Sequence, residues 1–591
     1  MSLPNVRTWS AIALLVMLQA PVTIAGKGGS PPTKKAHADR QIAQIARSGS
    51  SDTVHALVTV DGDLNVLSKA LRSKGIKVRR QLLRSGILAI DISGNHLVWL
   101  AGLDGVNSIS IDAEVAVAPL AAVTLGGGTG GKVEKANNLR AQLGLTDLDP
   151  KGNGIGVAVL DSGIAPGSEL ATRITAFYDF THGQRGTATK PNDHYGHGTH
   201  VAGLIAGSGS LSDGAYAGVA PNARLIGLKV IDDFGSGATS DVIAAVEFGI
   251  ANRAALGIDV MNLSLGHQPY ERAATDPLVK AVEAASRAGI IVVVSAGNAG
   301  VNPRTNQVAY GGILSPANSP SAYAVASAKT QGTIDPSDDL IANYSSRGPT
   351  WFDGFAKPDF AAPGQNLVAP VAPGSYLAMT YPSLLVADAA GKKNYIKLSG
   401  TSGAAGVESG LVAVVLEASR TATTTTNTLL GSTTRPRLTA NAIKAFMEYT
   451  AFTMRDANGN VYDRLTQGAG RVNGQGVVNL ARSADPSVPV GAPWLTAAVL
   501  PYSVYGGVTI PWTQNIVWGE NIVWGENIIG AKNIVWGENI LGANNIVWGE
   551  NIVWGENIVW GENIVWGENI IWGESLVDAN GRVTGLNVLG W

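Results

Sequence analysis

Short, nearly unbroken apolar runs alternate with amphipathic helical patterns between about residues 136 and 484. Apolar runs of this length are typical of strands that are buried on both faces, as in a parallel sheet covered by helices. One helical pattern between two such runs, at residues 242–250, places its apolar positions on a common stripe. We therefore expect a doubly wound, mainly parallel α/β domain over residues 136–484. The expected strands are residues 155–160, 224–230, 258–263, 290–294 and 323–326.

A different order of elements precedes this domain. Residues 52–118 have the pattern strand, helix, strand, strand, helix, strand, which predicts a small α+β sandwich with an antiparallel sheet. Residues 119–135 become rich in glycine and are predicted to be a cleavable linker. Residues 26–51, which contain two prolines and several lysines, are predicted to be a polar linker.

The first 25 residues have the pattern of a secretory signal peptide. Arg7 is followed by an apolar run at 11–18 and by the small-residue pattern at 23–25. The run is shorter than the ~20 residues that a membrane-spanning helix needs, which favours export over a membrane anchor. We therefore expect the protein to be secreted or to lie at the cell surface.

The C-terminal segment, residues 512–591, is dominated by a six-residue repeat, Asn-Ile-Val-Trp-Gly-Glu, and follows a predicted linker at 485–511. The even period keeps Ile and Trp on one face of an extended chain, and Gly-Glu-Asn supplies a turn. This pattern predicts a β-solenoid, and the spacing persists where Gly530 and Gly542 replace tryptophan. A disordered or aggregation-prone tail fits the pattern equally well. The one role that the repeat suggests is attachment to a surface or a partner.

Charge and cysteine content narrow the chemistry that the chain can perform. Its 43 basic and 45 acidic residues give a net charge of -2, which indicates no nucleic-acid or anionic-membrane partner. The 591 residues include no cysteine, which excludes disulfides, zinc–thiolate sites and thiol nucleophiles. Any catalysis must therefore use an oxygen nucleophile or carboxylates.

Polar residues follow several of the expected strands, at the sheet edge where sites form in this class of fold. Asp161 follows residues 155–160, Ser264 follows 258–263, and Asn298 lies just beyond 290–294. Two further candidates lie among small residues: His197 is flanked by glycines, and Ser402 lies at the expected start of a helix. A serine is a weak nucleophile unless a base takes its proton and dipoles stabilise the oxyanion. Ser402 is our candidate nucleophile, and the other residues are candidates for that support.

Taken in chain order, Asp161, His197, Asn298 and Ser402 lie in segments that resemble the subtilisin-like serine protease family. The resemblance extends across the expected α/β domain, and residues 52–118 resemble the family's cleaved propeptide, an intramolecular chaperone and inhibitor. Beyond the segments around these four residues, the matching motifs are residues 218–221, 345–349, 358–364 and 468–473.

The resemblance implies a role for each residue of this group. Ser402 would attack the scissile carbonyl, and His197 would take its proton and later give it to the leaving amine. Asp161 would orient His197, while Asn298 and the Ser402 backbone amide would form the oxyanion hole. Two chain edges would bind an extended peptide as added strands. The implied substrate-binding residues are Gly235, Ser236, Gly237, Ser264, Leu265, Gly266, Ala296 and Gly297.

The expected function is thus that of a secreted serine endopeptidase, made as a zymogen, that acts on loosely structured polypeptides through an acyl-enzyme. Its own propeptide would be a second partner. The alternative is a catalytically weak relative that presents the repeat for binding or structure. The chain departs from the family pattern at Gly403, Gly406 and Glu408, which affects the expected packing of the helix behind Ser402.

No cofactor is expected. Structural calcium is frequent in the family, but the sequence assigns no ligands to it. A cluster of His194, His197, His200 and Asp193 is an alternative metal site. The glutamate of the zinc-protease pattern His-Glu-x-x-His is missing, and we therefore expect no catalytic metal.

Overall fold

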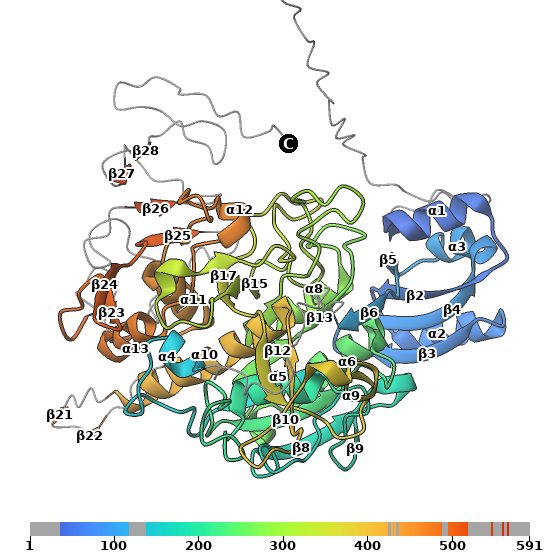
Figure 1. Cartoon of the computed structure of the whole chain (residues 1–591). Coiled ribbons are helices and arrows are strands. Elements are labelled where there is room, and N and C mark those ends of the chain that lie inside the picture. The colour runs from blue at the N-terminus through green and yellow to red at the C-terminus, as the bar shows by residue number, and fades with distance from the viewer. Residues whose placement is uncertain are drawn as a thin grey trace, which may run out of the picture. The chain divides into compact units, whose positions relative to one another are not determined.

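The computed structural model describes residues 36–117, 138–422, 427–428, 431–432, 437–486, 495–517 and three short strands within 545–566 (Figure 1). The expected signal peptide and the cleavable linker at 119–135 lie outside these residues. The chain divides into two compact units. The first consists of residues up to Gln81 together with Gly86–Ile111, and the second consists of Leu82–Ser85 and everything from Asp112 onward.

The first unit is an α+β structure with a five-stranded sheet in the order β1-β5-β2-β4-β3. Strand β2 runs antiparallel to both β4 and β5, as the sequence predicts. Helices and sheet share one apolar core that includes Ile42, Leu71 and Leu97. The elements are β1 (His37–Ala38), α1 (Arg40–Ser48), β2 (Thr53–Val60), α2 (Leu64–Ser73), β3 (Lys77–Leu82), β4 (Ile87–Ser93), α3 (Gly94–Ala101) and β5 (Val106–Ile111).

The prediction of a linker over residues 26–51 was wrong for its second half. Asp39 caps α1 by accepting a hydrogen bond from the backbone N–H of Ile42 at 2.7 Å, and Gly49 ends the helix in the left-handed conformation. Ile42 and Ala43 are buried in the core of the unit. The apolar residues of this short segment recur at helical spacing, so the helix forms by burying that stripe.

The second unit is built on a nine-stranded sheet in the order β16-β15-β14-β12-β7-β10-β8-β9, with β17 also paired to β15. All pairs are parallel except β8–β9 and β15–β16, which confirms the expected mainly parallel α/β sheet. The strands are β7 (Gly156–Asp161), β8 (Ile174–Asp179), β9 (Thr187–Ala188), β10 (Arg224–Lys229), β12 (Val260–Leu263), β14 (Ile291–Ser295), β15 (Tyr323–Lys329), β16 (Leu340–Ile341) and β17 (Phe360–Pro363).

Helices α5, α10, α11 and α13 share the large apolar core with one face of this sheet, and α6 packs against α8 (Figure 1). Short strands form two smaller sheets, β11-β6-β13 and β18-β20-β19. The helices are α4 (Leu139–Gln142), α5 (His197–Ala206), α6 (Thr239–Ala251), α7 (Arg253–Leu256), α8 (Pro277–Arg287), α9 (Tyr376–Thr380), α10 (Thr401–Thr421), α11 (Ala440–Thr450), α12 (Arg464–Gln467) and α13 (Gly474–Ser483). The short strands are β6 (Glu114–Val117), β11 (Ser236–Ala238), β13 (Leu265–Gly266), β18 (Leu367–Pro370), β19 (Leu385–Val386) and β20 (Tyr395–Leu398).

Gly403 and Gly406 lie inside α10, which continues without interruption to Thr421. At Gly406 an added Cβ would come within 3.3 Å of the backbone oxygen and of a methyl carbon of Val201 on α5. The glycine therefore allows α10 and α5 to approach closely, and tertiary packing offsets its low helix propensity.

The predicted boundary between a linker at 485–511 and a repeat module from 512 was also wrong. Strands β23 (Tyr502–Tyr505) and β24 (Val508–Pro511) form an antiparallel hairpin. Trp512 is buried in the large core, and its indole N–H donates to Ser503 Oγ at 2.9 Å. Its ring packs edge-on against Tyr449 of α11. A large aromatic side chain with a satisfied N–H belongs to the core of the domain, so the domain extends past residue 512.

Within the repeat, the structure describes four strands of three residues each. Strands β25 (Asn515–Val517) and β26 (Asn545–Val547) pair in parallel, and β27 (Ile558–Trp560) pairs antiparallel with β28 (Ile564–Trp566). The remaining repeat lies outside the described residues, so the solenoid stays a prediction. Among the helices of the described ranges, none combines the length and the apolar character needed to cross a membrane.

Candidate active site

Asp161 and His197 meet at the carboxyl end of the central sheet. Asp161 is the last residue of β7, and His197 is the first residue of α5; both are buried. His197 Nδ1 lies 2.8 Å from Asp161 Oδ1 and 3.0 Å from Oδ2. Burial alone would lower the pKa of His197, but the charge and hydrogen bond of Asp161 outweigh it and hold that pKa above its ordinary value. Asp161 thus orients the ring and leaves Nε2 as the nitrogen available to a nucleophile.

The start of α5 is held close to β7 by a residue that sequence reasoning had considered only as a metal ligand. The buried carboxylate of Asp193 accepts hydrogen bonds from the N–H groups of Gly196 at 2.7 Å and Thr199 at 2.8 Å, and from Thr199 Oγ1 at 2.6 Å. Ser162 Oγ donates to Asp193 at 2.9 Å and accepts from the N–H of Gly198 at 3.0 Å. These bonds satisfy free donors at the helix start and position His197.

Gly198 meets a steric requirement at the same helix start. An added Cβ would lie 2.1 Å from the carbonyl oxygen of Gly163 and 3.0 Å from the Cβ of Asp161. The absence of a side chain at Gly198 is therefore what lets α5 bring His197 against Asp161.

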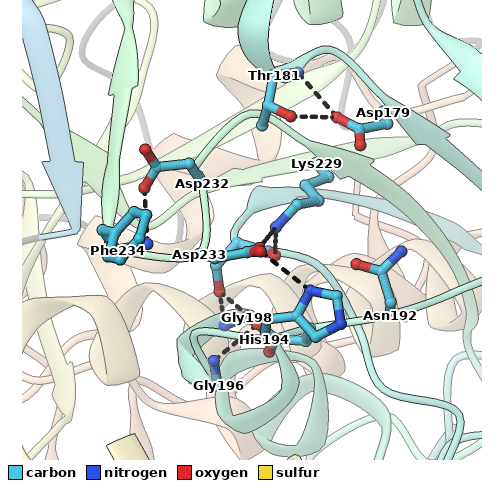
Figure 2. A network of polar contacts seen from close by, with 12 residues as sticks. Asp179, Thr181, Asn192, His194, Gly196, Gly198, Lys229, Asp232, Asp233 and Phe234 are labelled. Carbon is cyan, nitrogen blue, oxygen red and sulfur yellow. Dashed lines mark hydrogen bonds and ion pairs between the residues drawn. The ribbon is translucent and has the colours of Figure 1, made fainter. Parts of the chain in front are cut away.

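A second polar network joins the loop before α5 to the end of β10 (Figure 2). Asp233 accepts a hydrogen bond from Lys229 Nζ at 3.2 Å and lies 3.2 Å from His194 Nδ1. Lys229 Nζ also donates to the backbone oxygen of Ser162 at 2.7 Å. Burial works to raise the pKa of Asp233, but Lys229 and His194 outweigh it and hold that pKa below its ordinary value. The network thus links three loops at this rim of the sheet.

Ser402 is the second residue of α10 and is nearly buried. Its Oγ donates to the backbone oxygen of Ser264 at 3.2 Å, and Ser264 Oγ in turn donates to the backbone oxygen of Ser402 at 3.0 Å. Asn262 supports this pair by donating from Nδ2 to Ser264 Oγ at 2.9 Å. Ser402 and His197 line the same small pocket. Among the described residues, Ser402 Oγ bonds to Ser264 and makes no hydrogen bond to His197. Catalytic hydrogen bonds often form only when substrate binds, so two residues that line one pocket are still suited to be a nucleophile and its base.

Asn298 lies just beyond β14 and faces the start of α10. Its Oδ1 accepts hydrogen bonds from the N–H and the Oγ1 of Thr401, each at 3.0 Å. Thr401 Oγ1 accepts from the N–H of Gly297 at 3.1 Å, which ties the strand end to the same threonine. The amide nitrogen Nδ2 lies beside the same turn, 3.3 Å from the position of a Cβ added at Gly400. An amide donor beside the Gly400–Ser402 turn is well placed to stabilise an oxyanion.

The two edges predicted to bind substrate flank a strand of the chain itself. Strand β6 lies between β11 and β13 and is antiparallel to both. Ala116 is in register with Ser236 on one side and Gly266 on the other, and Val117 is in register with Leu265. The edges thus accept an extended segment by main-chain pairing, the mode that the sequence predicts for a polypeptide substrate.

The other predicted substrate-binding residues lie around the same edges. Gly235 precedes β11 with φ of 93°, and an added Cβ there would lie 2.6 Å from the ring of Tyr195. An added Cβ at Gly237 would lie 2.2 Å from the backbone oxygen of Val230. Ala296 is buried and connects β14 to Gly297 and Asn298. Space for the backbone, rather than side-chain chemistry, accounts for the small residues here.

The alternative metal cluster is not assembled. His194 faces Asp233, Asp193 is saturated by backbone and hydroxyl donors, and His200 Nε2 bonds to the backbone oxygen of Leu367 at 3.0 Å. Burial lowers the pKa of His200 to about 3, so the ring is neutral. Among the residues that the structure describes, no group of three or more His, Cys, Asp or Glu side chains is arranged to hold a metal ion.

The sequence of this chain is similar to the sequences of known proteases. Residues 152–477 match the model of the Subtilase family, Peptidase S8. The chain is 37% identical over 332 residues to the serine protease AprX of Bacillus subtilis (strain 168), an alignment covering 55% of this chain and 66% of that protein. It is 32% identical over 266 residues to subtilisin DY of Bacillus licheniformis, covering 45% of this chain and 78% of that protein.

The fold also has a counterpart among solved structures. The crystal structure of fervidolysin from Fervidobacterium pennivorans, a keratinolytic enzyme related to subtilisin, matches 82% of this chain and 67% of its own chain. The TM-score is 0.55 at 21% sequence identity, a likeness of fold. The aligned part of this chain spans just under two thirds of AprX.

Proposed function

The chain belongs to the subtilase family of serine proteases, and from this premise we propose that it is a secreted endopeptidase, made as a zymogen, that hydrolyses loosely structured polypeptides. The proposal depends most on the placement of Ser402 and His197 in one pocket, with Asp161 hydrogen-bonded to His197 Nδ1 and with β11 and β13 already holding an extended strand. The N-terminal pattern of residues 1–25 supports secretion.

In the proposed reaction, Ser402 Oγ attacks the scissile carbonyl carbon while His197 Nε2 takes the hydroxyl proton. Asp161 remains ionised and stabilises the imidazolium. The carbonyl oxygen becomes an oxyanion that accepts hydrogen bonds from Asn298 Nδ2 and the Ser402 N–H. His197 then protonates the amine as the peptide C–N bond breaks, which leaves an acyl-enzyme. Water, deprotonated by His197, hydrolyses that ester and restores Ser402.

The zymogen part of the proposal rests on β6. This strand, at residues 114–117, occupies the edges that a substrate would use, and it follows the α+β unit that resembles a propeptide. Such pairing would block substrate until the chain is cut after β6, in the predicted cleavable linker at 119–135. The N-terminal region would then act as both inhibitor and folding aid.

Replacing the nucleophile tests the proposal directly. Purified wild type should hydrolyse a casein-type substrate, lose this activity to a serine-directed inhibitor, and lose its N-terminal region. Ser402→Ala should remain folded, with a cooperative thermal transition, but lose both hydrolysis and processing. Ser419→Ala, a buried serine near the other end of α10, is the matched control and should retain both. Hydrolysis or processing by Ser402→Ala at the wild-type rate would overturn the proposal.

A further inference from the structure

A chain of hydrogen bonds joins the interior of α10 to the nucleophile through the central strand β12. Ser409 Oγ donates to Asn262 Oδ1 at 3.0 Å, and Asn262 Nδ2 donates to Ser264 Oγ at 2.9 Å. Ser264 Oγ donates in turn to the backbone oxygen of Ser402 at 3.0 Å. The side chains of Ser409, Asn262 and Ser264 are fully buried. Ser409 is therefore linked to Ser402 through two side chains, although it lies about two helical turns after it in α10.

Asn262 is the one polar residue of β12, which otherwise consists of apolar side chains. The strand runs between β7 and β14, where Asn262 is in register with Val159 and Val293. A buried amide costs free energy unless its hydrogen bonds are made, and here Ser409 and Ser264 supply the partners. A polar group in a strand of this kind is expected where function requires it.

Ser409 determines which way the Asn262 amide faces. Serines within helices often donate to a backbone carbonyl one turn earlier, but Ser409 donates across to Asn262 Oδ1 instead. Because Oδ1 accepts from Ser409, Nδ2 is the atom that donates to Ser264 Oγ, and the single proton of that hydroxyl is available for Ser402. With the amide reversed, Oδ1 would compete for this proton, and the backbone oxygen of Ser402 would lose its side-chain donor.

Ser264 holds Ser402 at two points. Besides the bond to the Ser402 backbone oxygen, the backbone oxygen of Ser264 accepts a hydrogen bond from Ser402 Oγ at 3.2 Å. Ser264 directly precedes β13, whose Leu265 and Gly266 are in register with the bound strand β6. These bonds therefore fix the nucleophile relative to the edge that would hold a substrate. A misplacement of about 1 Å can slow an enzyme by about 10²-fold.

We propose that Ser409 is a positioning residue for Ser402. By fixing the Asn262 amide, it directs the Ser264 hydroxyl proton to the backbone oxygen of Ser402 and so holds the nucleophile in line with a substrate paired to β13. Hydrogen bonds in a buried chain polarise one another, so loss of the first bond weakens the last. This assignment rests on the proposed peptidase function and adds to it a residue that touches neither the substrate nor the reacting atoms.

The test compares wild type with Ser409→Ala, after removal of the N-terminal region has been verified by mass spectrometry. We would measure kcat and KM on one peptide anilide, and the active fraction from the amount of Ser402 labelled by a sulfonyl fluoride. Ser409→Ala should lower kcat by about fivefold, the effect of one typical hydrogen bond, and leave KM within about twofold of wild type. Ser419→Ala, which removes another buried hydroxyl from α10, is the matched control and should leave both constants unchanged.

A cycle of single and double variants separates transmission along the chain from a general loosening of α10. Ser264→Ala should lower kcat by about tenfold, because the backbone oxygen of Ser402 loses its side-chain donor. Adding Ser409→Ala to Ser264→Ala should then lower kcat little further, because the last bond of the chain is already missing. Ser409→Cys, whose thiol is a weaker donor of similar size, should lower kcat less than Ser409→Ala and covers the case in which the alanine variant does not fold.

The rate of labelling by the sulfonyl fluoride is a readout that needs no peptide binding. In that reaction Ser402 Oγ bonds to sulfur, fluoride leaves, and His197 takes the hydroxyl proton. The labelling rate should fall in Ser409→Ala by about the same factor as kcat. The inference is overturned if Ser409→Ala labels and hydrolyses like wild type, if KM changes in place of kcat, or if the two effects multiply in the double variant. If folded wild type hydrolyses neither the peptide nor casein, the proposed peptidase function fails, and the labelling rates alone then decide the inference.

Discussion

The imidazole of His197 acts as a base only when it is neutral, so its contact with Asp161 governs the acidic limit of the proposed hydrolysis. Asp161 stabilises the protonated ring and raises its pKa, so activity is lost as pH falls through a value above the ordinary 6.5. We predict that the acidic limb of kcat/KM has its midpoint above that value. Asp161→Asn should move the midpoint to lower pH and reduce kcat by about 10⁴.

The measurement is the pH profile of kcat/KM for wild type and Asp161→Asn on one peptide, over a range in which circular dichroism shows both proteins folded. His194→Gln is a suitable control, because His194 faces Asp233 rather than Asp161. A wild-type profile that stays flat from about pH 5 to 9 would argue against His197 as the base.

Glu408 lies within α10, fully buried, and neither carboxyl oxygen has a hydrogen-bond partner among the residues that the structure describes. Burial raises the pKa of Glu408 to about 8. The folded protein thus keeps the Glu408 proton, which the unfolded chain releases near pH ~4.3. The contribution of Glu408 to the free energy of unfolding is therefore complete below that pH and declines as pH rises to about 8. We predict that wild type loses roughly 1.4 kcal/mol of unfolding free energy per pH unit across this interval, relative to Glu408→Gln.

Urea unfolding at several pH values checks this prediction, with both proteins carrying Ser402→Ala so that self-digestion does not interfere. The difference between the two unfolding free energies should shift steadily in favour of Glu408→Gln as pH rises from about 5 to 8. Parallel stability profiles would show that the Glu408 carboxyl ionises in the folded state as it does in the unfolded chain.

Strand β6 pairs with strands on both sides, so a change in β6 should alter the access of substrate to the edges of those strands. Ala116 is in register with Ser236 and with Gly266, so proline at this position removes a backbone N–H from the sheet. We predict that Ala116→Pro weakens retention of the N-terminal region after cleavage. Casein hydrolysis should then begin with a shorter lag than in wild type.

Glu114→Pro is the matched control for this strand. Glu114 is the first residue of β6, a position where proline is better tolerated, and its backbone is in register with Ala238 but with no residue of β13. The substitution also removes the hydrogen bond that the Glu114 carboxylate accepts from Ser236 Oγ, so a small effect is expected. Its lag should be closer to that of wild type. Equal lags for wild type and Ala116→Pro, with equal rates of chain cleavage, would show that β6 does not control access to the site.

Because Trp512 is buried in the core, the stability of the whole molecule depends on whether a deletion of the C-terminal repeat begins before or after this residue. A chain that ends at residue 517 keeps Trp512 in the core, whereas one that ends at 511 loses it. Loss of a buried large aromatic side chain costs about 3–5 kcal/mol. We predict that deleting 518–591 leaves Tm and casein hydrolysis close to wild type, whereas deleting 512–591 lowers Tm by several degrees.

The Tm of each truncation is measured by thermal unfolding of the protein that also carries Ser402→Ala. Casein hydrolysis is measured with the same truncations that retain Ser402. Equal Tm values would show that Trp512 contributes nothing to the domain. We also propose that the repeat attaches the protein to a surface or partner. The 518–591 deletion should then change where the protein adheres without changing hydrolysis, and unchanged adherence would contradict that role.

Several features of this protein could be predicted from local patterns in its sequence. Unbroken apolar runs placed the central parallel strands, and polar or small residues after those runs singled out Asp161, Ser264 and Asn298. The order of motifs along the chain was sufficient to indicate the family that the comparison then showed. These signals can be read from sequence because each depends on residues within a few positions of one another.

Features that depend on contacts between distant parts of the chain became visible only in the folded structure. It placed Asp193 under the start of α5, brought Trp512 into the core and set Tyr376 beside Tyr195. Residues 376 and 195 are far apart in the chain, and no local periodicity specifies which of their faces meet. Sequence patterns specify which side chains are buried, but the register and packing of the folded chain determine which of them become neighbours.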